Sequence, residues 1–220
     1  NNLSHEIRTP YTAIAGYSEI VEEFLEEGNY VAVKEIVLSV KEVLRRVLNV
    51  FSNVVELSQI ESGEFTLDIV TLNCNQVLRS VFNKMKNSII NKDIEFILNE
   101  ESEQFLINID WLKLEKILEA VVENSIKFTE RGKIIIASYS RDNNTYISVK
   151  DTGIGIEKDK LESLIEPFAQ EENGYTRSQQ GAGLGLSVAN KLTRLMSGSL
   201  HIISEKNKGT EIILSFPSAN

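Results

Sequence analysis

The sequence predicts an all-α helical hairpin followed by a layered domain in which strands and helices alternate. Two observations lead to this prediction. An apolar repeat with steps of three and four residues runs through residues 3–57, which is typical of helices packed in a bundle. Beyond Gly63 the spacing alternates between strand and helix periods, as in α/β or α+β domains. We therefore expect two domains, over residues 1–63 and 64–220.

The first domain should contain two long antiparallel helices. The apolar steps of the first helix run from Leu3 to Phe24, and Gly28 follows as a breaker. The second helix carries a wider apolar stripe from Val33 to Leu57 and ends at Gly63. One hairpin cannot bury both stripes, but two copies can close into a four-helix bundle. We therefore predict a homodimer.

The second domain is expected to contain seven strands and four helices. The strands are expected at residues 65–70, 94–99, 105–109, 133–141, 145–150, 200–204 and 210–216, and the helices at 75–91, 110–128, 158–165 and 184–196. Asp142, Asn143 and Asn144 predict a hairpin turn. The polar run over residues 169–180 predicts a long mobile loop.

Composition excludes several classes of protein. With 32 acidic against 23 basic side chains the net charge is −9, which disfavours binding to nucleic acid or anionic membranes. No apolar run approaches the roughly 20 residues that span a bilayer, so we expect a cytoplasmic portion whose membrane anchor, if any, lies in segments absent from this chain. The single cysteine, Cys74, fits a reducing compartment and is expected to be a packing residue.

The first helix carries a reactive cluster. His5 lies about 200° around the helix from the neighbouring positions of the apolar seam, so its ring is expected to face solvent. Thr9 lies one turn further on the same face, and Glu6 can reach the imidazole edge. Pro10 predicts a bend just beyond the histidine. On this motif alone, a merely solvated histidine near the start of the helix is the favoured interpretation, and only the second domain shifts the balance towards a reactive site.

A glycine-rich turn follows the strand expected at 145–150. Gly153 and Gly155 would let the backbone approach a flat ligand closely. Asp151, just before them, could accept a hydrogen bond from an adenine amino group. The same pattern also serves for ordinary turns, so it does not decide the function alone.

Two other segments offer groups for phosphates and a metal. Gly181, Gly183 and Gly185 precede a helix whose free N–H groups favour anions, although they match neither a P-loop nor a dinucleotide fingerprint. On the helix at 110–128, Asn124 could offer an oxygen to Mg²⁺ and Lys127 a positive charge to phosphates. A solvated helix end is the alternative for this second pair.

Taken in order, these segments resemble the catalytic core of a sensor histidine kinase of a two-component system, over essentially the whole chain. The matching motifs are the phosphoacceptor box at 4–10, the N box at 124–129, the first glycine box at 151–156, the F box at 166–168, the second glycine box at 181–186 and the final Gly209-Thr210. The resemblance implies a dimerisation and phosphotransfer hairpin joined to a two-layer α/β sandwich of the histidine kinase, gyrase and Hsp90 ATP-binding type.

The resemblance also implies an activity. ATP and Mg²⁺ would be the cofactors, and His5 would accept the γ-phosphoryl group, with Glu6 as a base or orienting partner. The phosphoryl group would pass to an aspartate on a response-regulator receiver domain. Thr9 matches the position that orients water for dephosphorylation of that partner, which implies a phosphatase activity as well.

The nucleotide site implied by the resemblance comprises Asn124, Lys127, Asp151, Gly153, Gly155, Phe168, Arg177, Gly181, Gly183, Gly185 and Thr210. Asn124 would hold Mg²⁺. Asp151 would read the adenine with support from Thr210. The segment between Phe168 and Gly181 would form a lid over ATP.

Three departures from the family pattern keep an alternative open. Ala120 stands where many members have asparagine, Gln170 is familiar in hybrid kinases, and Gln180 replaces a common glycine. The alternative is a nucleotide-binding scaffold, or a phosphatase-dominant regulator with weak autokinase activity. An ATPase clamp that works without His5 is a third hypothesis, which the helical hairpin disfavours.

Overall fold

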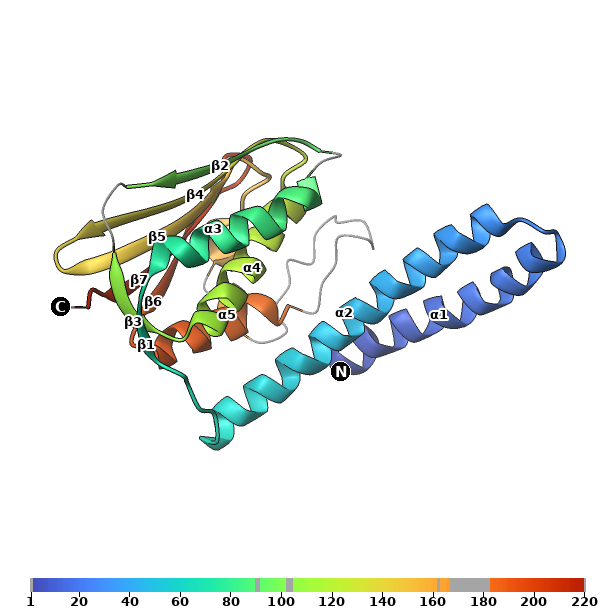
Figure 1. Ribbon diagram of the computed structural model, residues 1–220, viewed down its shortest axis with the longest axis horizontal. Helices are drawn as coiled ribbons and strands as arrows, with labels where there is room; N and C mark the ends of the chain where they lie inside the picture. The colour runs from blue at the N-terminus through green and yellow to red at the C-terminus, as the bar shows by residue number, and fades with distance from the viewer. Residues whose placement is uncertain (1, 90–91, 102–104, 162, 167–182, 220) are drawn as a thin grey trace. The chain divides into compact units, whose positions relative to one another are not determined.

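The computed structural model describes residues 2–89, 92–101, 105–161, 163–166 and 183–219, except the side chains of residues 2–7 and 9. The chain divides into two compact units, Asn1–Gly63 and Glu64–Asn220 (Figure 1). None of the helices described is long and apolar enough to cross a membrane.

The first unit is a hairpin of two antiparallel helices, α1 (Asn2–Glu26) and α2 (Tyr30–Ser62) (Figure 1). Helix α1 continues through Pro10 without interruption. The Asn29 side chain caps α2 by accepting a hydrogen bond from the Ala32 amide at 3.2 Å. Gly63, at φ 74°, ends α2 in the left-handed conformation that glycine favours. The predicted helical hairpin is confirmed.

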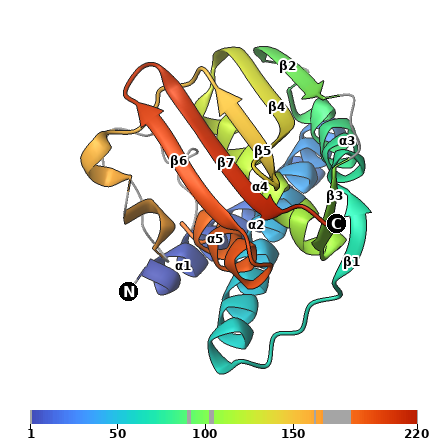
Figure 2. The same cartoon turned by 90° about the vertical axis from the view of Figure 1, so that its left-hand side faces the viewer.

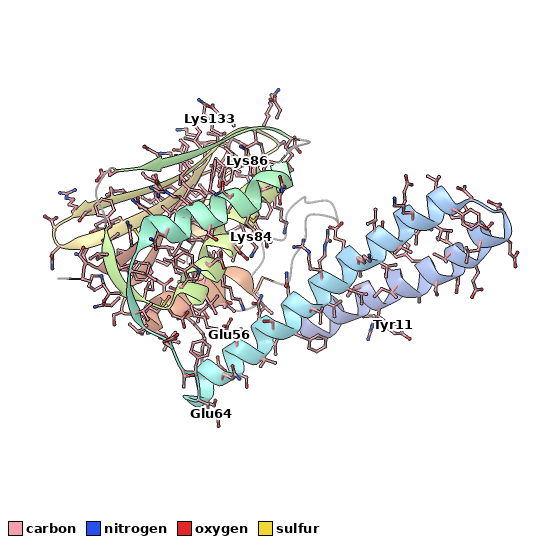
Figure 3. The ribbon with its side chains drawn as sticks, viewed as in Figure 1. Tyr11, Glu56, Glu64, Lys84, Lys86 and Lys133 are labelled. Carbon is pink, nitrogen blue, oxygen red and sulfur yellow. The ribbon has the colours of Figure 1, made fainter. Side chains whose placement is uncertain are left out.

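Two apolar stripes can be told apart on α2. Val33, Val40, Val47 and Val54 are half-buried. A second set is between 41% and 67% exposed and consists of Val37, Leu44, Leu48, Phe51 and Val55, which we call the outer stripe. On α1, the Tyr11 side chain also points away from α2 (Figure 3). The hairpin therefore buries only part of its apolar surface by itself.

The second unit is a two-layer α/β sandwich, as predicted. Its five-stranded sheet has the order β2-β4-β5-β7-β6, with β2 parallel to β4 and the other neighbours antiparallel. The strands are β2 (Asp93–Glu100), β4 (Arg131–Arg141), β5 (Asn144–Asp151), β6 (Ser199–Glu205) and β7 (Gly209–Pro217). Helices α3 (Cys74–Met85), α4 (Trp111–Phe128) and α5 (Gly185–Leu195) cover one face of the sheet (Figures 1 and 2). Strands β1 (Val70–Asn73) and β3 (Leu106–Ile109) form a separate antiparallel pair.

The core lies between the helices and the sheet. Its fully buried side chains include Leu78, Leu114, Ile117, Leu118, Ile134, Ile147, Leu192 and Phe216. Cys74 is also fully buried, and burial raises the pKa of its thiol to about 12, so it is an inert packing residue as expected. Outside the core, Lys84 pairs with Glu119 between α3 and α4, and Lys133 pairs with Glu95 between the neighbouring strands β4 and β2 at 2.8 Å.

Some predicted elements were wrong. Residues 65–69 form no strand, because the Asp68 amide bonds to the Asp110 carboxylate at 3.0 Å instead of joining a ladder. The helix expected at 158–165 is two 3₁₀ turns, η2 (Lys158–Lys160) and η3 (Ser163–Ile165). Helix α3 ends at Met85, and a 3₁₀ turn, η1 (Lys86–Ile89), follows. The loop predicted at 169–180 lies outside the described residues.

The predicted hairpin between β4 and β5 is confirmed. Asp142 and Asn143 adopt positive φ angles of 51° and 60°, as a two-residue turn between twisted strands requires. The remaining strands and helices end within a few residues of their predicted limits.

Candidate nucleotide-binding site

Helix α4 supplies polar groups from its last two turns. Asp110 caps the start of the helix, and its carboxylate accepts a hydrogen bond from the Lys113 amide at 3.1 Å. Ser125, on its inner face, is buried, whereas Asn124 and Lys127 are partly exposed. Successive residues of one turn therefore point a hydroxyl into the unit and an amide towards solvent.

The carboxyl-terminal end of α4 is held by two other segments. The Lys92 ammonium donates to the carbonyl oxygens of Ile126 and Thr129, where a cation also complements the helix dipole. The Phe128 carbonyl accepts a hydrogen bond from the Ile154 amide at 3.2 Å, which joins the helix to the loop after β5.

Asp151, the last residue of β5, lies at the centre of the site. It is only 6% exposed. Its Oδ1 accepts hydrogen bonds from the amides of Gly153 at 2.9 Å and Thr210 at 3.1 Å, and its Oδ2 accepts one from the Ser125 hydroxyl at 3.2 Å. Burial raises the pKa of Asp151 above its ordinary value, while the three hydrogen bonds act in the opposite direction.

The glycines after Asp151 are required by contacts within the chain. A Cβ built at Gly153 would lie 2.4 Å from the Phe128 carbonyl oxygen. At Gly155, where φ is 60°, a Cβ would lie 2.0 Å from the Glu205 carbonyl oxygen. The structure shows that these glycines let the loop approach α4 and the β6–β7 turn, whereas their predicted approach to a ligand stays a prediction.

The turn between β6 and β7 closes the other side of the loop. The Ser204 hydroxyl donates to the Gly209 carbonyl at 2.9 Å, accepts from the Ile156 amide at 2.8 Å and lies 2.8 Å from the Thr210 hydroxyl. Thr210 therefore contacts Asp151 through its backbone amide, and its side chain faces Ser204.

The start of α5 lies beside α4. A Cβ built at Gly185 would be 3.7 Å from the Ala120 Cβ, which is an ordinary contact. Gly183 has a φ of 65°, a conformation that glycine favours. The N-cap position is Leu184, and no side chain caps the helix. Among the residues that the structure describes, no side chain accepts from the first amides of α5, which lie next to the helix that carries Asn124.

Other predicted site residues stand as follows. The Lys127 ammonium lies over the Phe128 ring, 4.8 Å from its centroid. Phe168, Arg177 and Gly181 lie outside the described residues. His5, Glu6 and Thr9 belong to α1, but their side chains are also outside the described part of the chain, so the predicted exposure of the His5 ring is not tested.

Sequence reasoning missed two residues of the site, Ser125 and Ser204. The hydroxyl of each serine forms a hydrogen bond with a residue far away in the chain, Asp151 for Ser125 and Ile156 for Ser204. No motif spacing marks such a contact. The only signal was the position of Ser125, directly after Asn124.

Metal-binding groups are few. Among the residues that the structure describes, no three His, Cys, Asp or Glu side chains are grouped so that they could hold a metal ion. Asn124 is partly exposed, and an amide oxygen suits a cation that takes most of its ligands from phosphates and water.

Comparisons with known proteins cover both units. The family described as "Histidine kinase-, DNA gyrase B-, and HSP90-like ATPase" matches residues 109–220, and the "His Kinase A (phospho-acceptor) domain" matches residues 1–63. The autoinducer 2 sensor kinase/phosphatase LuxQ of Vibrio harveyi is 32% identical over 98% of this chain. The chain spans only 26% of the length of that relative.

Two solved structures share the fold. Full-length ShkA in complex with AMPPNP has a TM-score of 0.73 at 27% identity, over 99% of this chain and 45% of that one. The histidine kinase ThkA in complex with the response regulator protein TrrA has a TM-score of 0.74 at 22% identity, over 99% of this chain and 60% of that one.

Proposed function

This chain belongs to the sensor histidine kinase family, and from that membership we propose that it is an ATP-dependent autokinase that phosphorylates His5. The observation that carries the proposal is the arrangement around α4. A buried carboxylate, Asp151, lies at one turn of the helix, and the uncapped start of α5 contacts the preceding turn at Ala120. A base and a polyphosphate could thus be held along one helix.

Asp151 would bind the base. Its carboxylate is oriented by fixed backbone amides before any ligand arrives, so little rearrangement opposes binding. Phosphates would lie near the first amides of α5, which no side chain of the described residues caps, with Gly183 and Gly185 leaving room for them. ShkA, with 27% identity, was solved with the ATP analogue AMPPNP, which supports this assignment.

Asn124 would hold Mg²⁺, which would neutralise phosphate charge when bound. The donor set fits, because Mg²⁺ commonly takes few protein ligands and completes its shell with phosphate oxygens and water. Lys127, on the same helix, would add positive charge near the phosphates. Phosphoryl transfer depends mainly on such positioning and charge neutralisation.

The hairpin would carry the phosphoacceptor chemistry. We propose that His5 takes the phosphoryl group on a ring nitrogen, that Glu6 orients or deprotonates the ring, and that Thr9 serves in dephosphorylation of the partner. The group would pass to an aspartate of a receiver domain, as the complex of ThkA with its response regulator protein TrrA suggests. The kinase/phosphatase LuxQ supports the second activity.

We also propose that the hairpin is a homodimer. The outer stripe of α2 repeats at steps of seven, four and three residues, which is the spacing of a helix seam. A second copy offers the same stripe, and pairing two hairpins would bury both in a four-helix bundle.

The test is incubation of the chain with Mg-ATP labelled on the γ-phosphate. We expect a label on the protein that is lost in acid and stable in alkali, and that His5→Gln abolishes. His201→Gln is the matched control, because His201 is the other histidine of the chain and lies exposed on β6. Labelling of His5→Gln at the wild-type rate would refute the proposal. ADP release without labelled protein would favour the nucleotide-binding scaffold.

A further inference from the structure

The two oxygens of the Asp151 carboxylate are not equivalent. Oδ1 already accepts two backbone hydrogen bonds, from Gly153 and Thr210, which fill its lone pairs. Oδ2 accepts one hydrogen bond from the described residues, from the Ser125 hydroxyl at 3.2 Å. Any ligand donor that meets this carboxylate must therefore meet Oδ2, beside Ser125.

Ser125 has little freedom at this position. It is 4% exposed and lies on α4, whose inner face packs against the sheet. An ionised carboxylate can only accept, so the Ser125 hydroxyl must point its hydrogen at Oδ2. The lone pairs of the Ser125 oxygen then remain available next to the lone pair of Oδ2 that no described residue uses. The pair therefore presents acceptors and no donor hydrogen.

A pair of acceptors without a donor hydrogen distinguishes purines by the group at their 6 position. An amino group carries two N–H donors, which suit two neighbouring acceptors. A 6-oxo group is an acceptor and would face Oδ2 without a hydrogen bond. If Asp151 were protonated, its O–H could donate to a 6-oxo group and the distinction would weaken.

We propose that Ser125 is a positioning residue that keeps Asp151 an acceptor-only group and thereby makes the site select a 6-amino purine over a 6-oxo purine. The inference rests on the proposed binding of the base at Asp151. Ser125 contributes by donating to Oδ2, which fixes the orientation of the carboxylate and favours its ionised form.

The test measures dissociation constants of ADP and inosine diphosphate for the whole chain between pH 5 and 8. The variant is Ser125→Ala, which suits a helix interior and should fold. The matched control is Ser80→Ala, because Ser80 also lies on a helix and donates to a carboxylate, that of Glu115, at 2.7 Å. Fluorescence of the sole tryptophan, Trp111, confirms that each variant is folded.

We expect Ser125→Ala to weaken ADP binding about tenfold at pH 7 and to change inosine diphosphate binding by less than about twofold. Loss of ADP affinity on acidification should begin at higher pH in Ser125→Ala, because removing a hydrogen bond to the ionised form raises the pKa of Asp151. Ser80→Ala should match wild type in both measurements.

Two different failures can be told apart with Asp151→Asn. If Asp151→Asn loses ADP selectivity while Ser125→Ala keeps the wild-type selectivity and pH profile, the role of Ser125 is refuted and base binding at Asp151 stands. If Asp151→Asn binds both nucleotides as wild type does, the proposed base site itself is wrong.

Discussion

Replacing Gly155 by alanine should destabilise the second unit by about 3 kcal/mol. Its φ of 60° costs a residue with a Cβ about 1 kcal/mol or more. The new Cβ would lie 2.0 Å from the Glu205 carbonyl oxygen, and relieving such overpacking typically costs about 1–3 kcal/mol. Moving the loop after β5 away from the β6–β7 turn would also strain the hydrogen bond from the Asn207 amide to the Ile154 carbonyl, whose length is 2.7 Å.

Urea and thermal unfolding, followed by the fluorescence of Trp111, measure this effect. Trp111 is the only tryptophan and belongs to the second unit, so its signal reports that unit. A loss of 3 kcal/mol corresponds to about 6–12 °C in Tm for a domain of this size.

The matched control is Gly185→Ala, in the other glycine-rich motif. There the new Cβ would meet, among the described residues, just the Ala120 Cβ at 3.7 Å, and the position lies at the start of a helix, where alanine is favoured over glycine. We expect unchanged or slightly higher stability. The reasoning fails if Gly155→Ala unfolds within about 0.5 kcal/mol of wild type, the range of an ordinary surface change, or if both variants lose the same amount.

Three further predictions follow. Thr129→Val should raise the free energy of unfolding by about 1 kcal/mol, because the buried Thr129 hydroxyl has no hydrogen-bond partner within the described residues; a lower Tm would contradict this. Asp151→Asn should stabilise the second unit at pH 7, because burial raises the pKa of Asp151 and so disfavours its ionised form. The gain in the free energy of unfolding, measured with urea, should shrink as the pH falls through that raised pKa towards the ordinary aspartate value. A gain that grew on acidification would contradict this prediction. If the proposed homodimer forms through the outer stripe, Phe51→Glu should be a monomer in sedimentation velocity, whereas Ser52→Glu, at the neighbouring exposed position, should stay a dimer. A Phe51→Glu dimer would exclude the outer stripe as the interface.

The sequence predicted most of the fold because its periodicities are local. The heptad of the hairpin and the alternation of the long strands each reflect one buried face. The strand expected at 65–70 shows where this fails. Phe65 and Leu67 alternate with polar residues, but the segment is held by α4, with the Lys113 ammonium over the Phe65 ring at 4.9 Å and the Asp110 carboxylate on the Asp68 amide. Periodicity predicts which face is apolar and does not reveal which backbone groups find a ladder partner.

The residues of the candidate site stay a prediction, but the structure gives some of them a physical role that the sequence did not. Gly153 and Gly155 are needed for contacts with Phe128 and Glu205, which no sequence pattern reveals. Ser125 was overlooked because a serine inside a helix carries no spacing signal of its own. Its contact with Asp151 exists only after α4 has packed on β5.

The position of β7 has a consequence for biosynthesis. This strand follows β6 in the chain but is inserted between β5 and β6 in the sheet. Until β7 has left the ribosome, β5 presents an unpaired border to other nascent chains, and Asp151 lacks the Thr210 amide that helps to orient it. Binding of ATP could therefore stabilise the second unit only once the sheet is complete, and not while the earlier strands are being translated.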